Sequence, residues 1–346
     1  MTIADDIHVR KVGPTGRITL TRPEALNAMT YEMCMAIGSA LEEWISDKDV
    51  RIVMIDAEGS RSFCSGGDIA ELYDTGKAGD FEYGRKFWAD EYRIDAMIKN
   101  YPKPYVAIMD GIVMGGGVGI SAHGSHRIVT ENTLFAMPEC GIGLAPDVGG
   151  NWILSRAPGH VGEYLGSTGA RLKAADCIYA GIGDCFVPEA KISDLVEALE
   201  DTADLSFIDT FVDDLEPGNL SLEQGKIDKY FSGETAADIA KSLEASKEEW
   251  EAATAKLMRR GCPLSVACAV EIVRLARHES TIEEILKQEY RFTYRSMSHG
   301  DFIEGIRAQI IDKDRNPKWN PSTLEKLDKH QISAMLEPLG ENELAF

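Results

Sequence analysis

The sequence has no long hydrophobic run, no closely paired cysteines and few basic residues for its length. Its most apolar stretch, residues 105–120, is interrupted by Asp110 and five glycines, so a membrane-spanning helix is not expected there. The seven cysteines are odd in number and form no CxxC motif, which favours reduced thiols over a disulfide framework. The N-terminal residues "MTIADDIHVRK" lack the apolar segment of a signal peptide. These features predict a soluble protein of the cytoplasm.

The shortage of basic residues leaves a strongly acidic chain. Its 36 Lys and Arg residues stand against 57 Asp and Glu residues, a formal net charge of −21. Such a charge repels nucleic acids and anionic membrane surfaces, so neither is an expected partner. A local group of Lys and Arg residues could still bind the phosphates of a small molecule. With 346 residues, of which 44% are hydrophobic, the chain can bury a large core and suggests more than one domain.

Strand and helix patterns alternate in the first half of the chain. Short apolar runs at residues 17–22, 50–57 and 103–111 predict buried strands. Residues 30–47 have helical spacing of apolar positions, with Thr30 at the expected N-cap. Strands that alternate with helices in this way predict an α/β fold with crossover connections.

The character of the sequence changes near residue 189, where helical patterns take over. Residues 263–279 begin with a proline at a position typical of a helix start, and residues 281–297 continue the helical pattern. Residues 213–221 are the clearest loop. We therefore expect a catalytic core over residues 1–200 and a mostly helical region over residues 201–346.

The first motif with chemical potential is "SFCSGGDIAEL", residues 62–72. Two successive glycines allow a backbone in which N–H groups point outward and can hold an oxyanion, such as the one that forms on a thioester carbonyl. The N–H of Ser65 is the candidate donor. Two alternatives stay open: an ordinary turn in which Asp68 caps the next helix, and a nucleophilic Cys64, which has no His close by in the sequence.

The second motif is "DGIVMGGGVGISAHG", residues 110–124, where three glycines open a helix. The N–H of Gly116 is the natural second donor to an oxyanion. Residues 117–122 also fit a relaxed dinucleotide-binding pattern, but no strand–helix unit follows them. His123 and His126 could form a metal pair, although nothing else in the sequence marks a metal site.

The third motif is "MPECGIGLAPDVGG", residues 137–150, which sets two acids in an apolar, turning segment. Glu139 and Asp147 are eight residues apart, and the glycines and proline between them can fold the segment so that both carboxylates face one site. Burial raises the pKa of a carboxylate and makes it a competent base. The alternative is that these acids cap helices, with Asp147 before the helix that follows it.

In this order and at these separations, the three motifs resemble the crotonase (enoyl-CoA hydratase/isomerase) superfamily. Residues 18–30 resemble the first strand of that family and its CoA-contacting turn, and residues 166–188 resemble its segment after the active site. The resemblance implies a crotonase-type spiral of ββα units with a helical C-terminal extension, an acyl-CoA substrate, and no metal or redox cofactor. It implies substrate contacts at Leu26, Gly66, Gly67 and Asp68.

Several residues differ from the hydratase pattern, and these differences point to one family within the superfamily. The hydratases carry a catalytic Glu where this chain has Gly119, while their other catalytic Glu matches Glu139. Asp147, the GGGVG form of the glycine loop and residues 290–321 instead resemble the 3-hydroxyisobutyryl-CoA hydrolase family. In that family an acid ahead of the third strand binds substrate, and Glu91 matches it. The implied reaction is hydrolysis of 3-hydroxyisobutyryl-CoA or 3-hydroxypropionyl-CoA, as in valine catabolism.

The resemblance also assigns roles. The thioester carbonyl would lie between the N–H groups of Ser65 and Gly116, Glu139 would attack it or activate water, and Asp147 would orient the substrate or the water. Two other functions stay open: an enoyl-CoA hydratase or isomerase, and a non-catalytic acyl-CoA-binding protein. Homo-oligomers are implied by the superfamily. The candidates for binding the CoA phosphates are Arg22, Lys313, Arg315 and Lys318.

Overall fold

The computed structural model describes residues 6–346, which fall into two compact units. Unit 1 runs to Gly67 and includes Arg93–Phe135 and Leu172–Ser221. Unit 2 comprises Asp68–Tyr92, Ala136–Arg171 and Leu222–Phe346. Because each unit draws on three separate segments, this division does not follow the single boundary near residue 200 that the sequence suggested.

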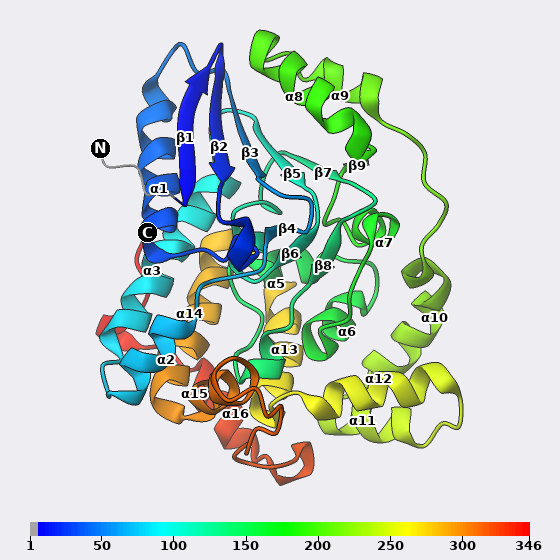
Figure 1. Cartoon of the computed structure of the whole chain (residues 1–346). Helices are drawn as coiled ribbons and strands as arrows, with labels where there is room; N and C mark the ends of the chain where they lie inside the picture. The colour runs from blue at the N-terminus through cyan, green and yellow to red at the C-terminus, as the bar shows by residue number, and fades with distance from the viewer. Residues whose placement is uncertain (1–5) are drawn as a thin grey trace. The chain divides into compact units, whose positions relative to one another are not determined.

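Unit 1 is built on a six-stranded sheet with the order β1-β2-β3-β5-β7-β9 (Figure 1). Only the β1–β2 pair is antiparallel, and the other pairs are parallel. The six strands are β1 (Ile7–Val12), β2 (Thr15–Leu20), β3 (Ile52–Ala57), β5 (Tyr105–Met109), β7 (His126–Val129) and β9 (Cys185–Phe186). A second sheet has the order β4-β6-β8, from β4 (Ser62–Cys64), β6 (Ile112–Met114) and β8 (Leu134–Ala136). The α/β class is confirmed.

The first predicted helix and strands are confirmed within a few residues. Strands β2, β3 and β5 lie in the three apolar runs named above. Helix α1 (Tyr31–Ser46) begins after Thr30, whose hydroxyl accepts a hydrogen bond from the Met33 N–H at 3.2 Å. An N-cap of this kind satisfies one of the backbone donors that a helix start leaves without an intrahelical acceptor.

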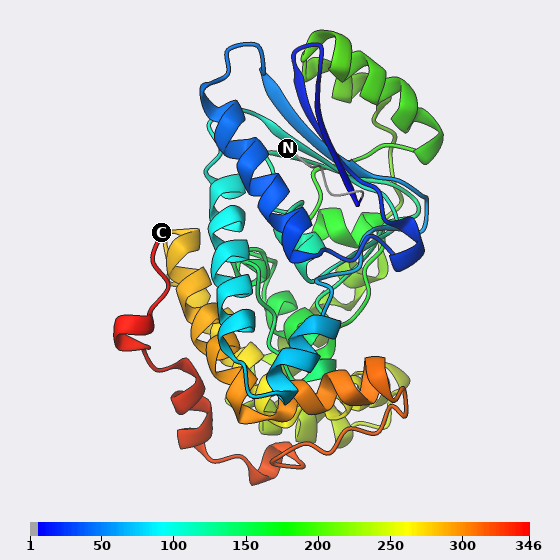
Figure 2. The ribbon, with the colours of Figure 1, turned by 60° about the vertical axis from the view of Figure 1, so that its left-hand side comes forward.

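Helix α1 lies along the sheet of unit 1 (Figure 2). Its buried residues include Met33, Ile37, Leu41 and Trp44, at the three- and four-residue spacing of one helix face. The ring of Trp44 packs so closely on β2 that a Cβ added to Gly16 would lie 2.5 Å from it. A side chain at position 16 would therefore push this helix off the sheet.

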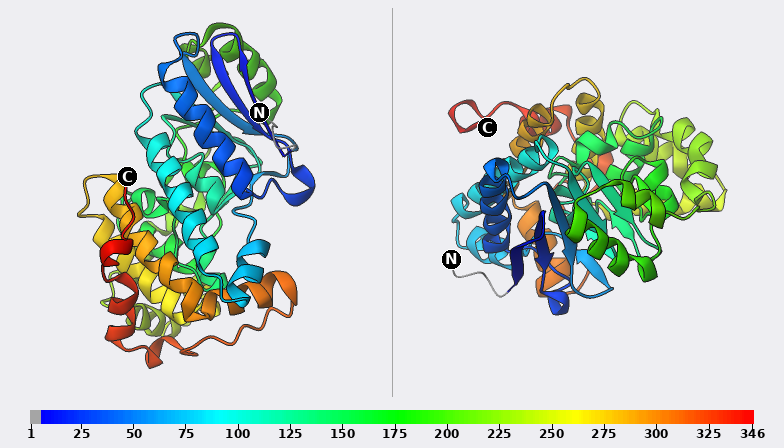
Figure 3. Two further views of the ribbon diagram at one scale, coloured as in Figure 1. Left: turned by 90° about the vertical axis from the view of Figure 1, so that its left-hand side faces the viewer. Right: turned by 90° about the horizontal axis from the view of Figure 1, so that it is seen from above.

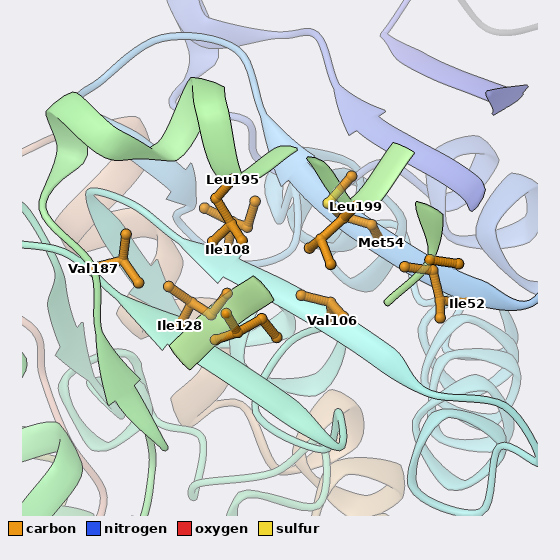
Figure 4. Packing of buried hydrophobic residues seen from close by; sticks show 10 residues of the cluster. Ile52, Met54, Val106, Ile108, Ile128, Val187, Leu195 and Leu199 are labelled. Atoms are coloured by element: carbon orange, nitrogen blue, oxygen red, sulfur yellow. The ribbon is translucent and has the colours of Figure 1, made fainter. Parts of the chain in front are cut away.

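A hydrophobic core lies between this sheet and two helices, α8 (Glu189–Thr202) and α9 (Ser206–Phe211) (Figure 4). Alternate strand residues, such as Ile52 with Met54 and Val106 with Ile108, face the same side because side chains alternate along a strand. Leu195 and Leu199 of α8 pack against them. The helical pattern after residue 189 thus begins with helices that complete the α/β unit.

Unit 2 is mostly helical. Helices α13 (Pro263–Ala276), α14 (Ile282–His299) and α16 (Lys329–Leu336) lie side by side in it (Figure 3). The first two confirm the helices predicted over residues 263–279 and 281–297, and Pro263 is the first residue of α13. The other helices placed wholly in this unit are α2 (Ala70–Lys77), α5 (Gly150–Leu154), α6 (Val161–Thr168), α11 (Ala236–Glu244), α12 (Glu249–Arg260) and α15 (Asp301–Ile306).

Helices α4 (Gly116–Gly119) and α7 (Ala174–Tyr179) belong to unit 1, whereas α3 (Glu82–Lys99) and α10 (Asn219–Phe231) have residues in both units. The predicted loop over residues 213–221 is confirmed for residues 213–218, which lie between α9 and α10, whereas residues 219–221 begin α10. Across residues 6–346, no helix combines the length and the apolar character needed to cross a membrane.

Candidate active site

Three acids that the sequence singled out are buried together in unit 2. Glu91 comes from α3, Glu139 begins the short 3₁₀ helix η2 (Glu139–Ile142), and Asp147 lies in the turn before α5. Their exposed fractions are 3%, 4% and 4%. The negative charge of Asp147 raises the pKa values of both glutamates, which places the three carboxyl groups near one another. The turning segment therefore does bring its two acids to one place.

The cluster has little to balance its charge. Within residues 6–346, none of these three carboxyl groups forms an ion pair with a Lys, Arg or His. Burial, and then the charge of Asp147, raise the pKa values of Glu91 and Glu139 well above the ordinary range. Burial also raises the pKa of Asp147 to about 7. Raised pKa values bring such carboxyl groups closer to the range in which they can both accept and donate protons near neutral pH.

Asp147 is held by a tyrosine and does not act as a helix cap. The hydroxyl of Tyr92 donates to Asp147 Oδ2 at 2.7 Å, and this bond lowers the carboxyl pKa against the effect of burial. The N-cap of α5 is Gly149, which has no side chain to cap it. The alternative in which Asp147 caps this helix is therefore not what the structure shows.

One carboxyl oxygen of Glu139 is free of hydrogen bonds from the described residues. Among the described residues, its Oε2 atom is buried and has no hydrogen-bond partner. A buried acceptor without a partner is costly, and in native proteins it usually marks a site that a ligand or water completes. Glu139 is thus the member of the cluster with an oxygen available to a reacting molecule.

A fourth buried acid, Glu289 of α14, was not anticipated. It is 1% exposed and accepts three hydrogen bonds from the turn that carries Asp147: from the Gly149 N–H at 2.7 Å, the Asn151 N–H at 3.1 Å and Asn151 Nδ2 at 2.8 Å. The sequence did hold a signal, because Glu289 lies on the apolar face of α14 with Ile285, Leu286 and Phe292. A charged residue on the buried face of a helix indicates a buried polar partner.

The two glycine-rich loops meet in unit 1. A Cβ added to Gly117 would lie 2.4 Å from the carbonyl oxygen of Cys64, and one added to Gly66 would lie 4.0 Å from the Gly116 nitrogen. Gly66 also has φ of +116°, which residues with side chains rarely adopt. Gly117 is therefore required by the close approach of the two backbones, and Gly66 by its own backbone conformation. The Gly116 N–H, the first of α4, has no acceptor inside its own helix.

The structure does not favour Ser65 as the partner of Gly116. The Ser65 N–H donates to the carbonyl oxygen of Leu26 at 3.1 Å, so it is already engaged. The next amides are those of Gly66 and Gly67, and no hydrogen bond from either N–H is found within the described part of the chain. The expectation for Ser65 is corrected accordingly: the amides of this loop that have no acceptor among the described residues are those of Gly66 and Gly67.

At position 119, where the hydratases carry a catalytic Glu, the carboxylate of a neighbouring residue occupies the space. Gly119 is buried, and a Cβ added there would lie 2.4 Å from Asp95 Oδ1. Asp95 is itself fully buried on α3. The space that a side chain at position 119 would need is therefore filled by another carboxylate, and both residues belong to unit 1.

The other candidate residues named from the sequence lie in ordinary structural surroundings. Cys64 is buried, with its Sγ 3.7 Å from the Gly66 carbonyl oxygen. Asp68 accepts a long, 3.4 Å bond from the Ala70 N–H at the start of α2. Leu26 is half-buried in the turn after the 3₁₀ helix η1 (Pro23–Ala25). His123 and His126 are not part of a metal-binding group, and no such group is found among residues 6–346.

Comparison with known proteins agrees with this arrangement. A family model described as "Enoyl-CoA hydratase/isomerase" matches residues 15–336. The chain is 37% identical to the Gallus gallus protein named "3-hydroxyisobutyryl-CoA hydrolase, mitochondrial". The matched residues make up 99% of this chain and 91% of that relative. It is 35% identical to the Homo sapiens protein of the same name, with coverage of 99% and 91%.

Two solved structures are similar over almost their whole length. One, described as an enoyl-CoA hydratase from Rhodobacter sphaeroides 2.4.1, has 48% identity, a TM-score of 0.94 and coverage of 99% and 100%. The other, described as a carnitinyl-CoA dehydratase from Mycobacterium thermoresistibile, has 40% identity, a TM-score of 0.95 and coverage of 99% for both chains. The predicted crotonase-type fold is confirmed. The chain belongs to the crotonase superfamily of enoyl-CoA hydratases and isomerases and, within it, to the 3-hydroxyisobutyryl-CoA hydrolase family.

Proposed function

We propose that this protein hydrolyses the thioester of a short 3-hydroxyacyl-CoA, either 3-hydroxyisobutyryl-CoA or 3-hydroxypropionyl-CoA, to the free acid and CoA. The observation that carries the proposal is the buried pair of Glu139 and Asp147, in which Glu139 keeps an oxygen without a partner among residues 6–346. Family membership supports thioester hydrolysis, since the curated relatives are named as hydrolases.

In the proposed mechanism, backbone N–H groups of Gly67 and Gly116 receive the carbonyl oxygen as it becomes an oxyanion. One such donor contributes about 3 kcal/mol to lowering a barrier of this type. Their position at the meeting of two glycine loops supports this role, because no side chain separates the amides from a carbonyl group.

Glu139 supplies the attack. Either its carboxylate adds to the carbonyl carbon and forms a mixed anhydride that water then cleaves, or it removes a proton from a water molecule that attacks directly. In both routes the C–S bond breaks, the water oxygen ends in a carboxylic acid and the sulfur leaves with a proton. A carboxyl group with its pKa near 7, as burial gives Asp147, is suited to deliver that proton.

The two routes differ in where oxygen from water goes. In a single turnover in heavy-oxygen water, cleavage of the anhydride at the Glu139 carbonyl carbon labels the Glu139 carboxyl group and leaves the product unlabelled, whereas direct attack labels only the product. Mass spectrometry of the peptide that contains Glu139 distinguishes them.

The proposed function is tested with a panel of acyl-CoA substrates. We expect free thiol from the 3-hydroxyacyl-CoA thioesters and no loss of enone absorbance with crotonyl-CoA. Loss of that absorbance without thiol release would instead establish a hydratase, the activity for which the similar Rhodobacter protein is named. Tight CoA binding with no turnover would establish a binding protein. The glycine at position 119 favours hydrolysis, because it carries no carboxyl group where the hydratases have their second catalytic acid.

Three accompanying features are proposed on the same basis. The reaction uses no cofactor beyond the CoA of its substrate, and the protein forms homo-oligomers, as its superfamily implies. A cytoplasmic location stays a prediction from the sequence, and it differs from the mitochondrial location in the names of the curated relatives. Residues 1–5, on which part of that prediction depends, lie outside the described residues.

A further inference from the structure

The turn that carries Asp147 has an unfavourable backbone. Val148, a β-branched residue, has φ of 54°, in the left-handed region that such side chains rarely adopt. Gly149 follows with φ of 71°. A strained conformation of this kind persists only where surrounding contacts hold it in place.

Glu289 provides those contacts from α14, about 140 residues further along the chain. Its Oε2 atom accepts from the Gly149 N–H, and its Oε1 atom accepts from both the N–H and the Nδ2 of Asn151. Asn151 Nδ2 also donates to the Pro146 carbonyl oxygen at 2.7 Å. The hydrogen bonds of Glu289 and Asn151 therefore fix the chain both before and after Asp147 and Val148.

The pattern of donors fits a carboxyl group and excludes an amide. Three N–H groups point at the two oxygens of Glu289, and an amide would turn an N–H donor toward one of them. No Lys, Arg or His pairs with Glu289 within residues 6–346. The hydrogen bonds from these backbone and amide groups lower the pKa of Glu289, whereas burial raises it to about 8.

From this geometry we propose that Glu289 is a positioning residue: it fixes the turn of residues 146–151 and thereby holds the Asp147 carboxylate against Tyr92. Both of its oxygens accept hydrogen bonds from this turn, so we assign it a role in holding the turn and not in contacting the substrate. The proposal rests on the proposed function for its catalytic consequence, but the fixing of the turn can be measured without any substrate.

The test compares Glu289→Gln with a control on the same helix, Glu284→Gln, which neutralises a half-exposed acid paired with Lys287. The first measurement is amide hydrogen exchange at Gly149 and Asn151. We expect both amides to be protected in the wild type and in Glu284→Gln, and to exchange much faster in Glu289→Gln. Unchanged protection in Glu289→Gln would overturn the proposal.

The second measurement is the hydrolysis of 3-hydroxyisobutyryl-CoA, with rates referred to folded protein. Misplacing a catalytic group costs about 10- to 100-fold in rate, so Glu289→Gln should lower kcat by that factor while KM changes little. A merely structural role would lower the unfolding temperature and leave kcat unchanged, which would also overturn the proposal.

If Glu289→Gln fails to fold, Asn151→Ala keeps the carboxylate and removes two of the contacts. It should show the same fall in kcat and faster exchange at Gly149, to a smaller extent, and normal values of both would count against the proposal. A wild-type protein that releases no CoA from any 3-hydroxyacyl-CoA would refute the proposed function alone, because the exchange experiment still decides whether Glu289 holds the turn.

Discussion

The hydroxyl of Tyr92 donates to Asp147 Oδ2 over 2.7 Å, in the middle of the buried acids of unit 2. Tyr92 is itself fully buried, and burial together with the charge of Asp147 raises its pKa, so it stays protonated. This donor favours the charged form of Asp147, whereas burial opposes it. The balance keeps Asp147 as the acid of the cluster most ready to ionise near neutral pH.

Removing that donor should shift the pH profile. In Tyr92→Phe the pKa of Asp147 rises and, because protonated Asp147 is the proposed donor to the leaving sulfur, the alkaline limb of kcat/KM moves to higher pH. A hydrogen bond to a charged group is worth about 1.5–3 kcal/mol, which corresponds to a shift of about one to two pH units. The measurement is kcat/KM for thiol release between mildly acid and alkaline pH.

Tyr83→Phe is the matched control for that experiment. Its hydroxyl also donates to a carboxylate, Glu71 Oε2, at 2.6 Å, but at an exposed position away from the acid cluster. Its profile should coincide with the wild-type one. A Tyr92→Phe profile that also coincides with the wild type would show that the bond does not govern an ionisation used in catalysis.

The stability of the protein should decrease as the pH rises through the pKa of Asp147. Burial raises this pKa from 3.8 to about 7, so the folded state binds a proton more tightly than the unfolded state does. The contribution is therefore complete below the unfolded pKa of 3.8, and it is lost progressively as the pH rises from there through the folded pKa of about 7. It is on the order of 4 kcal/mol at most, since one pKa unit is worth about 1.4 kcal/mol.

Asp147→Asn removes that contribution. Urea unfolding at pH 5 and pH 9 should give a smaller difference in the free energy of unfolding for the variant than for the wild type. Part of the difference should remain, because burial also raises the pKa of Glu289, to about 8. An equal pH dependence in the two proteins would mean that Asp147 titrates with an ordinary pKa.

Position 119 should not tolerate a side chain. In Gly119→Ala the new Cβ would lie 2.4 Å from Asp95 Oδ1, closer than real Cβ contacts. Overpacking of a buried site costs about 1–3 kcal/mol, so the unfolding temperature should fall. Gly141→Ala is the control, because a Cβ there would meet nothing within 4 Å. Equal stability of the two variants would contradict the close approach of Asp95.

The sequence predicted those parts of the site that depend on local backbone chemistry. Glycine runs identified both outward-facing loops, and the turn residues around Glu139 and Asp147 predicted that these acids face one place. It named Ser65 as an oxyanion donor and missed that this amide is already bonded to Leu26, because that bond joins segments almost forty residues apart.

Long-range partners could not be predicted in the same way. Tyr92 and Glu289 reach Asp147 from helices far away in the sequence, and nothing local indicates which buried polar residues will pair. The filling of the space at Gly119 by Asp95 is likewise a packing relation between two helices. The single boundary predicted near residue 200 failed to anticipate the interleaved units for a similar reason, since α8 and α9 cover the first sheet.

The central claim is that Glu139 carries out the attack on the thioester. It is tested most directly by free-thiol release from 3-hydroxyisobutyryl-CoA by Glu139→Gln, with Glu248→Gln as a control that neutralises an exposed acid. We expect kcat to fall by about 10²- to 10⁴-fold in Glu139→Gln, the usual contribution of such a group, and to be unchanged in the control. A Glu139→Gln protein that releases CoA at the wild-type rate would contradict the assignment.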